Sequence, residues 1–326
     1  MTPQAVVIQR FRAHRLRPLE LLPWALALGA YFGFPGYLQL GGQILIMVLF
    51  ALSLDLVLGY AGIVTLGHSA FFGVGAYAAG IYAVHVSGEP LSGLIVAAVT
   101  AGLVGYISGL VILRTRGLTL LMLTLAVTSL LAETANKASA ITGGNDGLQG
   151  IVINPILGRF EFDLFGRTAY FYCLIVLFLA WLFARCMVHA PFGQSLIGIR
   201  ENVDRMLAIG APVRRRLLGA YTISAALAGV AGALLTQTTQ FVGLTVLGFE
   251  RSGAVVIMLV LGGVGRLYGA FVGATLYMIA QDQLAEADPI FWDFWIGLLL
   301  VLIALFARGG VLGLADQLWL ALQRRR

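Results

Sequence analysis

Long apolar runs dominate this sequence and restrict its fold more than any other feature. Several of them approach or exceed the ~20 residues that a helix needs to cross the hydrocarbon core of a bilayer. The 326-residue chain is 60% hydrophobic and 11% charged, whereas soluble domains carry about 25% charged residues. The expected fold is therefore all-α, a polytopic membrane bundle of about 8–10 transmembrane helices, some of them interrupted.

The hydropathy pattern predicts a transmembrane domain over residues 19–308, between an N-terminal arm (1–18) and a C-terminal tail (309–326). The pieces 252–262 and 268–280 are each too short to cross a membrane alone at ~1.5 Å per residue, so together they form a re-entrant pair or a kinked helix. The count of ten crossings depends on this choice. The predicted pieces are 19–34, 40–58, 68–86, 92–113, 117–133, 169–188, 217–236, 252–262, 268–280 and 292–307.

The basic residues are distributed unevenly between the two sides of the predicted bundle. With ten crossings and a cytoplasmic N-terminus, 17 of the 21 basic residues face the cytoplasm and 4 face outward. This is the positive-inside pattern, and it explains the net charge of +6 without a nucleic-acid partner. The pattern predicts a multi-pass membrane protein with both termini in the cytoplasm, and it places the polar loop 134–168 on the outer side.

Two glycine-rich stretches interrupt the apolar runs at membrane depth. The first runs from Gly59 to Ser69 and the second from Gly262 to Gly269, and similar glycine-spaced text follows each. Non-helical backbone at that depth is tolerated only against protein or a watery cavity. Paired interrupted segments in corresponding halves indicate a substrate path in transporters.

Polar residues at the first break are the candidates for that path. Asp55 is the one carboxylate deep within an apolar run, and such groups often mark ion or substrate paths. It can instead hydrogen-bond the nearby glycine break. His68 either donates a structural hydrogen bond or belongs to a helix break or gate. No second His or Cys stands near it in the sequence at a spacing typical of a metal site. The candidate path residues are Asp55, Gly62, Thr65, Gly67, His68 and Ser69.

The loop 190–216 predicts a short amphipathic helix on the cytoplasmic surface. Its apolar residues recur at three- and four-residue steps over 194–209. Glu201 and Arg205 stand four residues apart on the other face, in the favourable order for an ion pair. Such a helix has the shape that the groove of a partner protein binds.

The sequence contains no phosphate-binding loop for ATP. That loop requires Gly-x-x-x-x-Gly-Lys-Ser/Thr, and Lys137, the single lysine, lies between Asn136 and Ala138. No paired carboxylates or Gly-x-Ser-x-Gly elbow indicates an enzyme either. We expect no catalytic residue, metal or cofactor in this chain, and any ATP and Mg²⁺ bound by partner subunits.

Several of these stretches together resemble the permease subunits of ATP-binding-cassette importers for branched-chain amino acids, the LivH/LivM family and its LivM type most closely. The resemblance covers residues from about 43 to 308. It is carried by Gly59-Tyr-Ala-Gly62, Leu66-Gly-His-Ser-Ala-Phe71, Gly75-Ala-Tyr77, Thr142-Gly-Gly-Asn-Asp-Gly-Leu148, Ile199-Arg-Glu-Asn202 with Ala208 and Gly210, Ser224-Ala225 with Ala228-Gly229, and Leu261-Gly-Gly-Val-Gly265.

The resemblance implies an importer of several subunits. A periplasmic binding protein would deliver the amino acid, two homologous permease subunits would form the path through the lipid, and two ATPases would dock on the cytoplasmic loop. By similarity, Arg200, Glu201, Asn202 and Gly210 belong to the loop that couples the permease to the ATPase.

Three features depart from the family pattern and leave the identity of the substrate undecided. Asp55 stands where an uncharged polar residue is expected, Ile63 replaces an expected Gln, and residues 265–270 lack the usual Thr and Pro. Relatives carry urea, amides and other small organic solutes, so these are alternative substrates. A proton-coupled secondary transporter using Asp55 and His68 is a further alternative, although it would need more buried titratable groups than this chain offers.

Overall fold

The computed structural model describes residues 22–156, 158, 160–163, 166–289, 291–292, 294–298, 301 and 310–313. Within them the chain forms helices joined by turns, together with two isolated β-bridges. The predicted arm, most of the predicted tail and most of the span 292–307 lie outside the described residues. The helices are α2 (Leu22–Gly33), η2 (Pro35–Tyr37), α3 (Leu38–Asp55), η3 (Leu56–Tyr60), α4 (Ser69–His85), α5 (Pro90–Ile112), α6 (Leu118–Lys137), α7 (Ser139–Thr142), η4 (Gly144–Asp146), α8 (Arg167–His189), α9 (Pro191–Glu201), α10 (Val203–Ala208), α11 (Val213–Thr239), η5 (Leu244–Leu247), α12 (Phe249–Gly262) and α13 (Leu267–Ala287).

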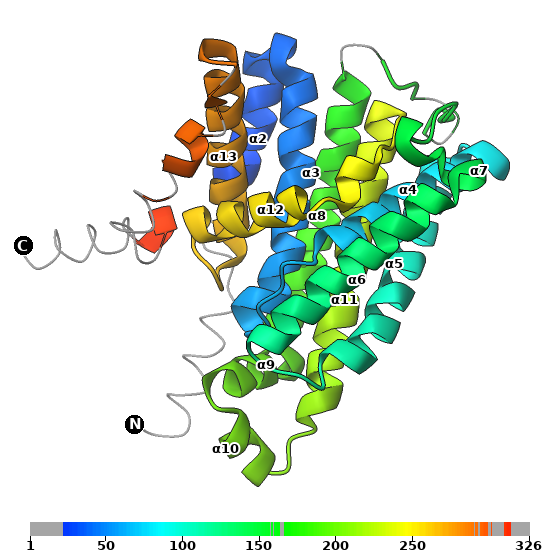
Figure 1. Cartoon of the computed structure of the whole chain (residues 1–326). Helices are drawn as coiled ribbons and strands as arrows, with labels where there is room; N and C mark the ends of the chain where they lie inside the picture. Colours follow the sequence, from blue (N-terminus) through cyan, green and yellow to red (C-terminus); the bar gives the residue numbers. More distant parts are fainter. Residues whose placement is uncertain are drawn as a thin grey trace, which may run out of the picture.

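The all-α, polytopic membrane fold expected from the sequence is confirmed. Five helical stretches of the described chain are long and apolar enough to cross a membrane, or six if α12 and α13 count as one broken span. These two helices are bent by 114° at their junction, so one straight helix is excluded. In Figure 1, α12 lies across the bundle and α13 runs along it. The described α2 and α4 have 12 and 17 residues, and the total of ten crossings stays a prediction.

Small residues bring three helices into close contact at the centre of the bundle. The long helix α11 packs against α4 and α5. A Cβ atom at Gly75 of α4 would collide with the backbone of Gly229, and one at Gly232 of α11 would collide with the carbonyl of Phe72. These small residues thus let helix backbones touch, as they do in many membrane bundles.

Aromatic side chains fasten α2 to the outside of this core. Trp24 is buried, and its ring packs edge-on against three neighbours. The ring centroids lie 5.0 Å from Phe178, 5.5 Å from Trp181 and 5.2 Å from Phe271. Edge-to-face pairs at such distances are favourable beyond the area that they bury. Helix α2 therefore has a defined place against α8 and α13.

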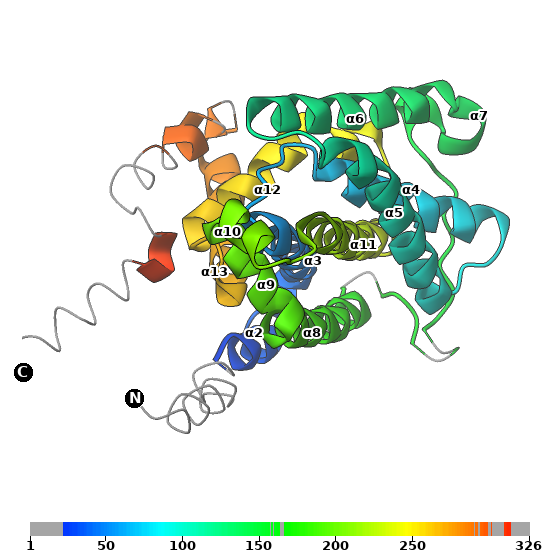
Figure 2. The same cartoon turned by 90° about the horizontal axis from the view of Figure 1, so that it is seen from below.

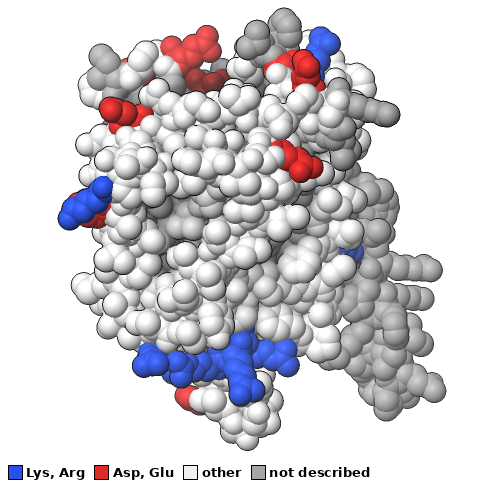
Figure 3. Space-filling view, turned by 90° about the vertical axis from the view of Figure 1, so that its right-hand side faces the viewer, with Lys and Arg blue, Asp and Glu red and all other residues white. Residues whose placement is uncertain are grey.

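Charged side chains separate toward the two ends of the bundle. Lys and Arg gather at the lower end of the face in Figure 3, while most Asp and Glu lie toward the other end. The exposed residues Arg114, Arg116, Arg205, Arg214 and Arg215 lie on turns and helix starts that share one end, here called the basic end. The apolar helices between the ends carry few charges, as expected for a membrane protein.

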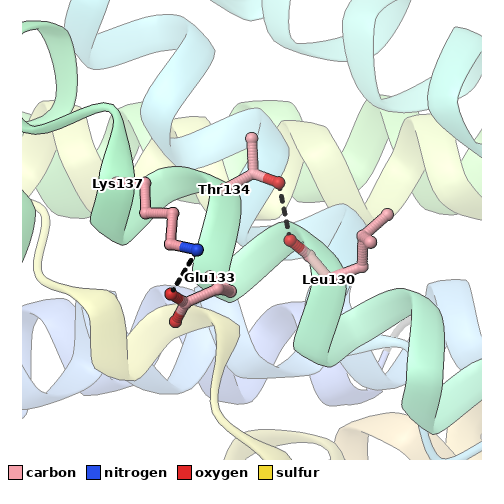
Figure 4. A network of polar contacts seen from close by, with 4 residues as sticks. All are labelled: Leu130, Glu133, Thr134 and Lys137. Atoms are coloured by element: carbon pink, nitrogen blue, oxygen red, sulfur yellow. Dashed lines mark hydrogen bonds and ion pairs between the residues drawn. The ribbon is translucent and has the colours of Figure 1, made fainter.

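The end of α6 shows how a helix changes from apolar to polar at the opposite end. Lys137 and Glu133 form an ion pair with an N–O distance of 3.5 Å, and the Thr134 hydroxyl donates to the Leu130 carbonyl at 2.7 Å (Figure 4). Both charged side chains are exposed, so the pair contributes little to stability. It marks the place where α6 leaves apolar surroundings.

The predicted surface helix forms two shorter helices instead of one. Helix α9 ends at Glu201, and α10 begins at Val203 after a residue of extended backbone, Asn202. The Asn202 side chain accepts a hydrogen bond from the backbone N–H of Arg205 at 2.9 Å, which is an N-cap. Because the chain breaks here, Glu201 and Arg205 do not share a helix face, and the predicted ion pair between them is wrong. We call residues 191–212 the ledge; α9 and α10 cross the basic end beneath α3 and α13 (Figure 2).

The close contact of α4 and α11 yields a prediction about stability. Replacing Gly75 by Ala forces the two backbones apart and is expected to cost about 1–3 kcal/mol of folding stability. Thermal unfolding of the purified protein in detergent measures this loss. The matched control is Gly29→Ala in α2, where a Cβ atom meets nothing within 4 Å. A Gly75→Ala variant as stable as this control would contradict the packing described here.

Candidate functional site

The first break begins where α3 widens and unwinds. Helix α3 passes into the π-helical turn η3, and the backbone N–H of Ala61 and Ile63 then bond to the carbonyls of Leu56 and Val57. Residues 61–68 follow without regular helix until α4 begins at Ser69. A π-turn inside a helix often occurs at a functional site. The sequence thus predicted the position of this break.

Asp55 links the first break to the second one. Its Oδ1 atom accepts a hydrogen bond from the backbone N–H of Gly265 at 2.7 Å, although the two residues are 210 positions apart. The side chain is fully buried, and its Oδ2 atom has no hydrogen-bond partner. Gly59 permits this approach, because a Cβ atom there would collide with both Asp55 and the Gly265 nitrogen. The structural interpretation offered from the sequence was a bond to the nearby break, whereas this bond reaches the distant one.

Arg200 of the ledge reaches the same junction from below. Its Nη1 atom donates a hydrogen bond to the Gly59 carbonyl, at the end of η3. The stem of its side chain lies against Gly62, where a Cβ atom would stand 2.9 Å from the Arg200 Cγ. Its Nη1 would stand 3.0 Å from a Cβ atom at Gly265. The two breaks and the ledge therefore meet at one place.

His68 belongs to a second buried group of polar contacts. Its Nε2 atom lies 2.9 Å from the Ser53 hydroxyl, which itself donates to the Phe50 carbonyl at 2.6 Å. Because the Ser53 proton is used in that bond, Nε2–H of a neutral His68 must be the donor to Ser53. The ring stacks on Phe50 with centroids 5.5 Å apart, and Nδ1 has no partner. Ser224 of α11 donates to the Ser53 carbonyl, so three helices meet here.

The start of α4 is held by α12. The backbone N–H of Ser69 bonds to the Ser252 hydroxyl at 2.9 Å, and that hydroxyl contacts the Ser69 Oγ at 2.7 Å. Nearby, Thr65 accepts from the N–H of Gly67 at 3.1 Å. A Cβ atom at Gly67 would collide with the backbone of Thr124 in α6. The backbone N–H groups that the unwound segment leaves without helical partners are thus bonded by side chains, from the segment itself at Gly67 and from α12 at Ser69.

The structure brings together most of the path residues predicted from the sequence. All of them except Gly62 are buried between helices, and Gly62 is exposed at the basic end. None of them lines either of two cavities of about 430 Å³ each that lie elsewhere on the described part of the structure. Ser53, Ser224, Ser252 and Gly265 complete the group, but they were not predicted. The predicted residues buried here are Asp55, Thr65, Gly67, His68 and Ser69.

The four predicted coupling residues separate into different roles. Arg200 and Glu201 are both exposed, but Arg200 also bonds to the Gly59 carbonyl in the junction, and Asn202 caps α10. Gly210 has a positive φ of 81° in the turn before α11, and a Cβ atom there would meet nothing within 4 Å. In the described part of the chain, no three His, Cys, Asp or Glu gather as metal ligands would.

Comparison with known proteins identifies the family. Residues 36–304 match the model of the family described as branched-chain amino acid transport system / permease component. The chain belongs to this family. It is therefore a multi-pass membrane permease of that family, as the resemblance implied.

Individual relatives agree with this assignment. The chain is 26% identical over 305 residues to the high-affinity branched-chain amino acid transport system permease protein LivM of Escherichia coli K12, covering 85% of this chain and 70% of that protein. It is 25% identical over 313 residues, 80% of this chain and 89% of the relative, to a probable LivM of Methanocaldococcus jannaschii. The autoinducer 2 import system permease protein LsrC of Enterobacter sp. 638 is 31% identical over 160 residues, 47% of this chain and 44% of LsrC. No solved structure matches the chain.

The bond between Asp55 and Gly265 yields a second prediction. In Asp55→Leu the N–H of Gly265 loses its acceptor, and leaving a buried donor unpaired costs about 1–3 kcal/mol. The unfolding temperature in detergent is expected to fall accordingly. The matched variant Asp55→Asn retains an acceptor oxygen of the same size and should stay close to the parent protein. Equal losses in the two variants would show that the charge, and not the hydrogen bond, holds the junction.

Proposed function

We propose that this chain is the membrane-spanning permease subunit of an ATP-binding-cassette importer for branched-chain or related small hydrophobic amino acids. The observation that carries the proposal is the meeting of two interrupted helices inside an apolar bundle, directly above an exposed ledge. Broken helices of this kind provide solute paths through membranes. Family membership and the printed functions of the LivM relatives support the substrate class.

The energy for import comes from separate subunits in this proposal. The chain has one lysine and no phosphate-binding loop, so it does not bind ATP in that way. Two ATPases, each with its own Mg²⁺ and ATP, dock on the ledges of two homologous permeases. Exposed apolar side chains on the ledge support this docking, among them Leu207 and Ile209, which are 51% and 71% exposed. A periplasmic binding protein delivers the amino acid from the other side.

The path itself follows the first break. Gly62 and Val64 are exposed on the unwound segment, while Asp55, Thr65 and His68 lie behind it. In this proposal the buried polar residues shape the path from behind, and the solute passes along the exposed side of the segment. Gly67 and Ser69 hold the far end of the segment against α6 and α12.

The distribution of charge supports an orientation in the bacterial inner membrane. The basic end faces the cytoplasm by the positive-inside rule, which places the ledge and both termini inside the cell. A cysteine at the exposed position 207, in a variant with Cys173 and Cys186 replaced by Ala, tests this orientation. It should react with a membrane-impermeant maleimide in inside-out vesicles and not in intact spheroplasts. Labelling in intact spheroplasts would overturn the orientation and, with it, docking of ATPases on the ledge.

Transport measurements test the proposed function directly. Cells that contain the full set of subunits should take up radiolabelled leucine, isoleucine or valine, and vanadate or loss of the ATPase should abolish the uptake. Uptake by this chain alone that collapses with the proton gradient would establish a secondary transporter instead. Uptake that depends on the ATPase but accepts urea or an amide in place of these amino acids would assign the alternative substrate class.

A further inference from the structure

Three glycines form a slot that the Arg200 side chain occupies. Gly62 and Gly265 have φ angles of +73° and +78°, which L side chains rarely adopt, and Gly59 lies where Asp55 and the Gly265 nitrogen approach. Cβ atoms at Gly62 and Gly265 would stand 2.9 and 3.0 Å from Arg200 atoms. We call these three residues the arginine slot. Two of them belong to the first break and one to the second.

The charge of Arg200 suits the position that it occupies. Carbonyl groups in the last turn of a helix lack partners within the helix and carry the negative end of its dipole. The carbonyls of Leu56 and Val57 accept from Ala61 and Ile63, and the carbonyl of Gly59 accepts from Arg200. A hydrogen bond from a cation to such a carbonyl is among the stronger ones in proteins.

The contacts form a closed ring through three segments that are distant in the sequence. Arg200 bonds to Gly59, Asp55 lies one turn before Gly59, Asp55 bonds to Gly265, and Gly265 abuts Arg200. Asp55 and Arg200 each bond to backbone of a break, and no ion pair within 4 Å joins them in the described structure. Both charges therefore hold backbone that has left the helix.

We propose that Arg200 is a positioning residue that connects the ledge to both breaks, and that it acts inward instead of contacting the ATPase. The inference rests on the proposed function, because it concerns how movement of the ledge reaches the path. When a docked ATPase shifts the ledge, Arg200 moves within the arginine slot and changes the position of the Gly59 carbonyl and of the α12–α13 junction together. Arg200 and Glu201 are both exposed, but only Arg200 bonds to a break, through the Gly59 carbonyl, and Glu201, one residue further, serves docking.

The test separates attachment of the ATPase from transmission through the slot. A cysteine at position 264, beside Gly265, in a variant with Cys173 and Cys186 replaced by Ala, reports on the second break. In the assembled importer its rate of maleimide labelling should differ by roughly five-fold or more between the nucleotide-free and the vanadate-trapped state, the lower end of typical allosteric couplings. In Arg200→Ala this difference should disappear while the ATPase still co-purifies with the permease. Glu201→Ala should instead reduce co-purification.

Matched variants exclude a merely structural effect. Arg116→Ala removes an exposed arginine from the same basic end but away from the ledge, and it should leave both readouts unchanged. Arg200→Lys keeps a charged donor for the Gly59 carbonyl and should retain part of the labelling difference. A persisting difference in Arg200→Ala, or loss of the ATPase equal to that in Glu201→Ala, would overturn the inward role without touching the proposed function. An importer that never binds an ATPase would overturn both.

A double-mutant cycle tests the arginine slot itself. Gly62→Ala displaces Arg200, so it should abolish the nucleotide-dependent difference in labelling and also lower the unfolding temperature in detergent, which is the readout of the cycle. In the Arg200→Ala background the added methyl group has no arginine to displace, so Gly62→Ala should lower the unfolding temperature less, by the backbone strain alone. The strain of a non-glycine residue at this φ is present in both backgrounds and cancels. Independent losses that add up would show that Gly62 and Arg200 do not act through one contact.

Discussion

The need of peptide groups for hydrogen-bond partners within an apolar bundle governs the arrangement of this molecule. A membrane provides no water at that depth, so backbone that leaves the helix must find partners in the protein. Each interruption meets this requirement with side chains from elsewhere in the chain: Asp55 for the N–H of Gly265, Arg200 for the carbonyl of Gly59, and Ser252 for the N–H of Ser69. Polar and charged residues that look misplaced in the sequence are therefore the partners of broken helices.

Much of the fold could be predicted from local patterns. The described helices lie where apolar runs and glycine breaks indicated, because helix length and backbone satisfaction depend on neighbouring residues. The unusual character of Asp55 was also visible, since a single carboxylate in an apolar run is costly. Its hydrogen-bond partner, Gly265, could not be predicted, because no periodicity connects position 55 to position 265. Ser53 and Ser252 escaped notice, and Ser224 was noted only for the family resemblance, because a serine in a membrane helix looks like any other small residue until its neighbours are known.

The ledge shows that apolar periodicity can mislead even within a short stretch of sequence. The apolar spacing across 194–209 continues through Asn202 as though one helix were present, yet the chain breaks there and begins again with that side chain as a cap. Asparagine is favoured at N-caps because its side chain replaces a missing backbone bond. Its place in the middle of a periodic stretch could have signalled a second helix start. Arg200 and Glu201 both lie before the break, at the end of α9, where neighbouring side chains of a helix point in different directions.

The glycine contacts between α4 and α11 have a consequence for how the molecule can change shape. Backbones that touch cannot slide past one another by even part of a turn without collision, so α4, α5 and α11 behave as a rigid body. The 114° corner between α12 and α13 is packed in the same way, because Cβ atoms at Gly262 and Gly273 would collide with the carbonyls of Gly269 and Met258. The stack and the corner are therefore two stiff bodies, and a change of shape must bend the segments that join them.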